Sequence, residues 1–191
     1  MNAFFRTFTR VRNLMLDPVK EWKVIAEEDN QRKTIFKRFV FPLLSLIAIA
    51  VIAGTWLNTS RELYSAGYVF SRIAILWASL SFGLFLSAYI ITEIMAQQVE
   101  SRNQNLAFAL IAYASGAAYL VIIIVSLFPF FSELLVLAFY SCYLFWRGIP
   151  YLIKVQGQKL MIYALLSFII IALIHFLLFF FFGNILGALF V

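Results

Sequence analysis

The 191-residue chain is 64% hydrophobic, 18% aromatic and 13% charged, with a formal net charge of +6. Soluble domains are about half apolar and about a quarter charged, so this composition excludes an ordinary soluble protein and requires lipid to cover part of the surface. Residues 1–38 hold nine of the fifteen Lys and Arg. No polar domain carries a basic face, which excludes nucleic acid as a partner.

Residues 1–38 are predicted to form a basic, amphipathic segment of one or two helices in the cytoplasm. The apolar side chains that share helical spacing in its first part are Phe4, Phe5, Phe8, Val11 and Met15. Arg6, Arg10 and Arg12 fall elsewhere on that helix. Apolar and basic residues combined in this way are typical of a helix in the headgroup layer, where anionic lipids attract the positive charges.

A second helix is predicted to begin at Asp17-Pro18, with Asp17 as the N-cap and Pro18 at the first helical position. Trp22 lies on its apolar stripe, and we place its ring at the membrane interface, where both the ring and its N–H are satisfied. The alternative is that this stripe packs on the protein itself.

Five apolar segments follow, each long enough to cross a bilayer core of about 30 Å as a helix of about 20 residues. They cover residues 39–57, 73–96, 106–128, 134–153 and 160–182. Such long runs argue against a β-barrel, so residues 39–191 are predicted to form an all-α, five-helix transmembrane domain. The first run follows a charged segment, which favours a retained anchor over a cleaved signal peptide.

The distribution of positive charge predicts the orientation. With the N-terminus in the cytoplasm, the inside regions carry thirteen Lys and Arg, including Arg102, Arg147, Lys154 and Lys159. The outside regions carry two, which are Arg61 and Arg72. The C-terminus is then expected outside.

Chemistry-bearing motifs are scarce. The chain has one histidine and one cysteine, Cys142, which excludes multi-histidine sites, cysteine-based metal sites and an intramolecular disulfide. It contains no nucleotide-binding loop and no hydrolase or metalloprotease motif. We therefore expect neither an enzyme nor a protein with a metal or cofactor.

Ionisable residues inside predicted spans are the remaining candidates, because such residues are rare in membranes and often functional. Glu93 and Arg147 are both expected near the cytoplasmic ends of their helices, and we hypothesise that they pair. Tyr140 and Tyr143 share a helix face with Arg147. Alternatively, Arg147 snorkels to lipid phosphates and Glu93 faces water in the inner leaflet.

The single histidine, His175, is expected in the outer half of the last helix. We interpret it as a neutral, hydrogen-bonded side chain, with Glu133 or a Ser or Tyr hydroxyl as its partner. Gly148 and Pro150 are expected to bend or end the fourth helix, because proline removes a helical hydrogen bond.

Two groups of residues carry a resemblance to a known family. The first is Leu16-Asp17-Pro18, Trp22, Ile25 and Glu28, and the second is Tyr140-x-x-Tyr143-Leu144, Gly148-Ile149-Pro150, Lys154 and Lys159. In this order they resemble bacterial-type members of the Yip (Ypt-interacting protein) domain family. The resemblance implies a five-helix membrane domain with a cytoplasmic N-terminus.

Eukaryotic members of that family bind small Rab-type GTPases, but the Asp-Leu-Tyr-Gly-Pro motif typical of them is absent here. We therefore expect a Yip-like scaffold or adaptor in a bacterial inner membrane. Its cytoplasmic segment would bind lipid, with anionic headgroups, or a protein partner, and the chain could form a homo-oligomer. The alternative is a transporter or channel for a small solute or ion that uses Glu93, Arg147 and the Tyr140/Tyr143 face.

Overall fold

The structure, a computed structural model, describes residues 3–58, 66–96, 103–155 and 157–190. All regular elements within these ranges are helices. Five helical stretches are long and apolar enough to cross a membrane, and they are Arg32–Asn58, Ala66–Glu93, Gln104–Leu127, Pro129–Leu152 and Lys159–Ile185. The all-α membrane fold with five spans is thus confirmed. The orientation stays a prediction, and two residues used to derive it, Arg61 and Arg102, lie outside the described residues.

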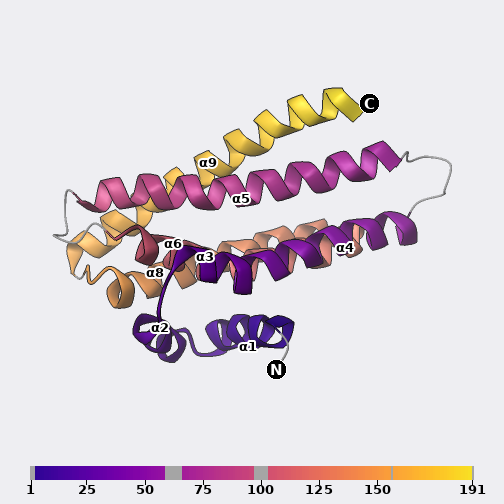
Figure 1. Ribbon diagram of the computed structural model, residues 1–191. Helices are drawn as coiled ribbons and strands as arrows, with labels where there is room; N and C mark the ends of the chain where they lie inside the picture. Colours follow the sequence, from indigo (N-terminus) through magenta and orange to yellow (C-terminus); the bar gives the residue numbers. More distant parts are fainter. Residues whose placement is uncertain (1–2, 59–65, 97–102, 156, 191) are drawn as a thin grey trace.

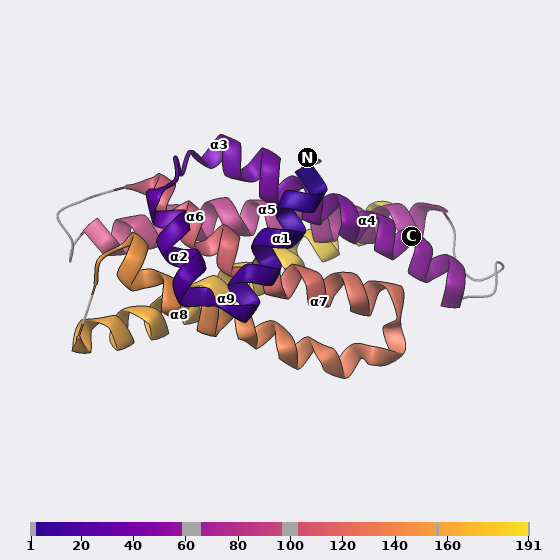
Figure 2. The same cartoon turned by 90° about the horizontal axis from the view of Figure 1, so that it is seen from below.

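The N-terminal segment forms two helices, α1 (Ala3–Leu16) and α2 (Pro18–Glu27). Helix α2 begins as predicted, because the Asp17 side chain accepts a hydrogen bond from the backbone N–H of Lys20 at 3.1 Å and Pro18 occupies the first position. Both helices lie on one side of the bundle, and α1 crosses it obliquely (Figures 1 and 2).

The first span begins earlier than the predicted residue 39. It consists of α3 (Arg32–Ile35), a π-helical turn (Phe36–Val40) and α4 (Phe41–Asn58). A proline ring cannot pack under the carbonyl four residues before it, and a wider turn just before Pro42 relieves this conflict. The helix extends through charged residues because its backbone bonds do not depend on apolar side chains.

The second span is α5 (Ala66–Ala96), and the third is divided into α6 (Gln104–Ala114) and α7 (Gly116–Leu127). The division at Ser115 frees backbone groups at the start of α7. One of them, the N–H of Ala118, donates to Ser141 Oγ on the neighbouring span at 3.0 Å. Satisfying such groups within the protein allows a helix to break at membrane depth.

The fourth span starts with η2 (Pro129–Phe139), a 3₁₀ segment with a kink at Phe131, and continues as α8 (Tyr140–Leu152). The predicted start at residue 134 was therefore too late. Pro150 lies in the last turn of α8, and the helix ends two residues later, as the sequence indicated. Lys154 then adopts a left-handed conformation with φ 62°.

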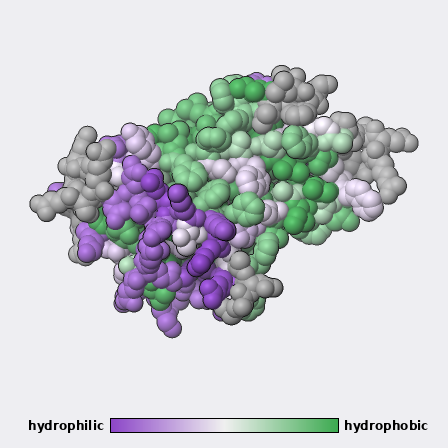
Figure 3. Space-filling model, in the orientation of Figure 1, coloured by the Kyte–Doolittle hydropathy of each residue, from purple (hydrophilic) through white to green (hydrophobic). Residues whose placement is uncertain are grey.

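The fifth span is α9 (Gln158–Phe190), which continues past the predicted end at residue 182. It packs mainly against α5, while α4 packs against α7. In Figure 1, α9 and α5 lie on the side of the bundle opposite to α1 and α2. Hydrophilic residues gather around α1, α2 and α3, and most of the remaining visible face is hydrophobic (Figure 3).

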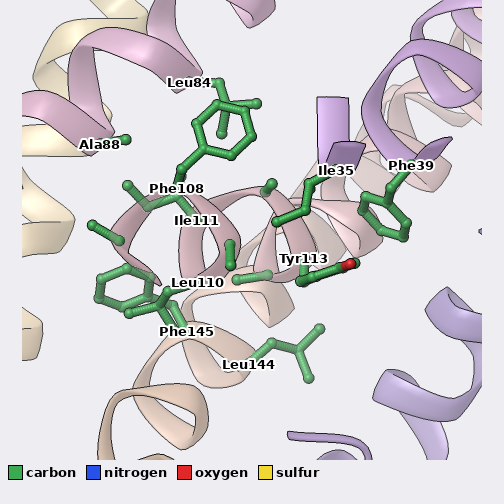
Figure 4. Packing of buried hydrophobic residues seen from close by; sticks show 14 of the residues in the cluster. Ile35, Phe39, Leu84, Ala88, Phe108, Leu110, Ile111, Tyr113, Leu144 and Phe145 are labelled. Atoms are coloured by element: carbon green, nitrogen blue, oxygen red, sulfur yellow. The ribbon is translucent and has the colours of Figure 1, made fainter. Parts of the chain in front are cut away.

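Helix α6 forms the centre of the core. Its residues Ala107 to Ala114 are all buried, and their side chains point in several directions toward the surrounding helices (Figure 4). Phe108 packs on Phe85 of α5 with ring centroids 5.0 Å apart. A helix that is apolar on every face can only be buried in protein or lipid, and here protein covers it.

Candidate functional site

Trp22 anchors the N-terminal helices to the bundle. Its side chain is fully buried, and its Nε1–H donates to the carbonyl of Leu144 in α8 at 3.1 Å. A Cβ on Gly148 would lie 2.7 Å from a carbon of the indole ring, so the glycine makes room for the tryptophan. The predicted position of Trp22 at the membrane interface was therefore wrong, and the alternative of packing on the protein holds.

Arg10 holds α1 and α2 together. Its guanidinium pairs with Glu21 at 2.8 Å and also with Glu28, and it lies 5.7 Å from the ring centroid of Tyr113 in α6. Burial alone lowers the pKa of Arg10, but the hydrogen bond to Glu28 and the nearby carboxylates raise that pKa above its ordinary value. Arg10 therefore remains cationic. Contrary to prediction, its guanidinium binds carboxylates of the protein and not the membrane interface.

The apolar residues of α1 divide between two surfaces instead of forming one stripe. Val11 and Leu14, which lie one helical turn apart, are each 1% exposed and pack on the bundle. The side chains that remain exposed are Phe4, Phe5, Phe8, Met15 and Leu16. Arg6 and Arg12 are also exposed, and their contact with headgroups stays a prediction. We call Phe4, Phe5, Phe8, Arg6 and Arg12 the phenylalanine–arginine surface.

Tyr140 links the C-terminal end of α1 to α8. Its hydroxyl donates to the carbonyl of Met15 at 2.9 Å, and its ring lies 5.4 Å from that of Tyr143. The sequence suggested a solute path along the face of Tyr140 and Tyr143. In the structure, Tyr140 on this face forms a hydrogen bond that holds the N-terminal helices.

The hypothesised pair of Glu93 and Arg147 does not form between these two described residues. Helix α5 packs on α4, α6 and α9, whereas α8 packs on α2, α6, α7, α9 and η2, so the two helices share α6 and α9 as neighbours. Arg147 Nε is buried and makes no hydrogen bond.

His175 fits into a gap in α5. Its Nδ1 lies 2.9 Å from the carbonyl of Ile171, one turn earlier in the same helix. Among the described residues this backbone oxygen is its hydrogen-bond partner, and not Glu133 or a hydroxyl as expected. A Cβ on Gly83 would lie 2.6 Å from His175 Nε2. Ser79, Gly83 and Ser87 are all buried and occur at intervals of four. This spacing of small residues, which brings helices close together, is a signal that our sequence reasoning missed.

The residues behind the family resemblance come together in space. Trp22 from the first group contacts Leu144 and Gly148 from the second, and Tyr140 bonds to the residue before Leu16. The sequence model of the Yip1 domain matches residues 12–190, nearly the whole chain. The chain belongs to the Yip1 domain family.

This Yip1 domain protein has no match among curated proteins or solved structures. Within the described ranges, no group of three or more His, Cys, Asp or Glu side chains is arranged to hold a metal ion. The N-terminal helices are joined to each other by Arg10 and to α8 by the hydrogen bonds of Trp22 and Tyr140.

Proposed function

We propose that this Yip1 domain protein is a membrane scaffold that uses its phenylalanine–arginine surface, on the cytoplasmic side, to bind anionic lipid. The observation that supports it most directly is the exposure of Phe4, Phe5 and Phe8, which are 46%, 62% and 44% exposed on a helix whose other face is packed. Phenylalanine side chains grouped on an open surface indicate contact with lipid or with a protein partner.

Charge favours lipid as the partner. Arg6 and Arg12 are exposed beside the phenylalanines, and each basic residue near an anionic membrane contributes about 1 kcal/mol to binding. Because Trp22 and Arg10 fix the helix to the bundle, the surface is held in one orientation and loses little conformational entropy on binding.

The transporter alternative has less support. Solute transport through the predicted residues would need a polar cavity at Glu93, Arg147 and the two tyrosines, Tyr140 and Tyr143. The two cavities described below are lined mainly by apolar residues and include none of these four. A flux assay in liposomes comparing Glu93→Gln with the wild type tests this alternative, and unchanged flux would exclude a role for Glu93.

Spin labelling tests the lipid contact. In a Cys142→Ser background, Phe5→Cys or Lys23→Cys is labelled with a nitroxide, and the protein is placed in nanodiscs of phosphatidylglycerol or phosphatidylcholine. We expect the label at residue 5 to be accessible to oxygen and shielded from a water-soluble nickel chelate. The label at the exposed Lys23 position should show the reverse pattern.

Replacing Arg6 and Arg12 with glutamine should reduce the depth of the residue-5 nitroxide in phosphatidylglycerol membranes. Its depth in phosphatidylcholine membranes should stay unchanged. The proposal fails if residue 5 is as accessible to the nickel chelate as residue 23 in both lipids.

A further inference from the structure

Two adjoining cavities lie between α5 and α9 on one side and α7 and η2 on the other, and residues of α6 and α8 also line the first cavity. The first has a volume of about 370 Å³, and the second has a volume of about 500 Å³. Ile122 of α7 and Leu135 of η2 line both cavities, which places the two side by side along the bundle. His175 lies in the wall of the first cavity and Arg72 in the wall of the second.

The first cavity is apolar and opens toward the surroundings of the protein. Two of its lining residues, Leu135 and Phe139, are 47% and 73% exposed, so η2 forms an edge and not a closed wall. An apolar cavity does not hold water well. If the cavity were empty, the atoms that line it would lose dispersion contacts. In a bilayer, hydrocarbon is the material available to fill it.

Arg72 gives the second cavity a positive charge at its rim. Its side chain is exposed and makes no hydrogen bond or ion pair with the described part of the chain. Along α5, Arg72 precedes Gly83, which faces His175, by eleven residues, a rise of about 16 Å. This length is close to half of the hydrocarbon core of about 30 Å, which is the depth of one leaflet.

We propose that the two cavities bind one anionic phospholipid. One acyl chain lies along the apolar wall between Leu135 and His175, and the phosphate pairs with Arg72. A guanidinium forms parallel hydrogen bonds with phosphate oxygens, and the apolar part of the site matches an acyl chain in polarity and in depth. This site lies between α5, α7, η2 and α9 and is separate from the phenylalanine–arginine surface, so either proposal can fail without the other.

Photolabelling tests the site in the intact protein. The protein is reconstituted in phosphatidylcholine vesicles that contain a small fraction of phosphatidylglycerol with a diazirine in its acyl chain. After irradiation, peptides are mapped by mass spectrometry. We expect labelling to be concentrated on the peptides of α7, η2 and α9 that line the cavities.

A matched pair of variants separates the site from general lipid contact. Ala172 lines the first cavity, whereas the adjacent Leu173, 54% exposed, does not. Ala172→Trp should fill the cavity and reduce labelling of these peptides several-fold, while Leu173→Trp should leave it near the wild-type level. Equal labelling in the two folded variants would show ordinary annular lipid and overturn the proposal.

Arg72→Gln tests the headgroup contact and leaves the apolar first cavity unchanged, because Arg72 lines only the second cavity. It should remove the preference for labelled phosphatidylglycerol over labelled phosphatidylcholine, and Lys159→Gln, another exposed basic residue, should keep that preference. If Arg72→Gln retains the full preference, the assignment of the phosphate to Arg72 is wrong.

Discussion

At the scale of single residues, glycines determine how closely the helices approach. A Cβ on Gly54 of α4 would lie 1.8 Å from the backbone oxygen of Ser126 in α7, closer than any real contact. Gly148 and Gly83 make similar room for Trp22 and for His175. In a membrane, where apolar burial alone does not drive helices together, close backbone packing supplies much of the attraction.

Gly54→Ala should therefore be strongly destabilising. Because the atom in the way belongs to the backbone of Ser126, α4 and α7 must separate, and overpacking of this kind costs about 1–3 kcal/mol or more. The measurement is the midpoint of thermal unfolding in detergent. Gly183→Ala is the control, since nothing lies within 4 Å of its Cβ position. An equal midpoint for the two variants would contradict the close approach of α4 and α7.

At the scale of elements, α1 and α2 are part of the folded bundle and not a separate tail. Trp22 and Tyr140 each form a hydrogen bond between these helices and α8, and the Thr7 hydroxyl donates to the carbonyl of Arg38 at 2.9 Å. Arg10 joins α1 to α2. The phenylalanine–arginine surface thus has a fixed support.

Trp22→Ala should release this unit from α8. Truncation of a buried Trp costs about 3–5 kcal/mol, whereas Trp22→Phe, which mainly loses one hydrogen bond, should cost about 1 kcal/mol. Limited trypsin digestion of the protein in vesicles measures the release through cleavage at Lys20 and Lys23. Trp146→Ala, at a side chain that is 44% exposed, should leave the cleavage rate unchanged. Equal rates in Trp22→Ala and the wild type would show that Trp22 is not the anchor.

At the scale of the whole molecule, the five candidate spans among the described residues predict that the two ends of the chain lie on opposite sides of the membrane. The excess of positive charge predicts that the N-terminal side is cytoplasmic. This orientation puts the phenylalanine–arginine surface in the inner leaflet and Arg72 in the outer one. The two proposed lipid contacts therefore belong to different leaflets.

Thiol labelling in cells tests the orientation. In a Cys142→Ser background, Glu133→Cys should react with a membrane-impermeant maleimide added outside, and Lys23→Cys should react only after the membrane is permeabilised. Both native side chains are exposed. Glu133 is four residues from the start of the fourth span, which the predicted orientation places at the outer surface. The opposite pattern would invert the orientation and both leaflet assignments.

The sequence by itself determined the membrane class, the five spans and the start of α2, because long apolar runs and the Asp17-Pro18 cap are local signals. It also identified the family through two short groups of residues. Tertiary structure decided the rest: burial of Trp22 depends on Gly148, which is distant in sequence, and the roles of Arg10 and Tyr140 depend on how α1 meets the bundle. Glu93 and Arg147 looked like partners because the sequence predicts a similar depth in the membrane for both residues. Which helices become neighbours in the bundle is decided only by packing.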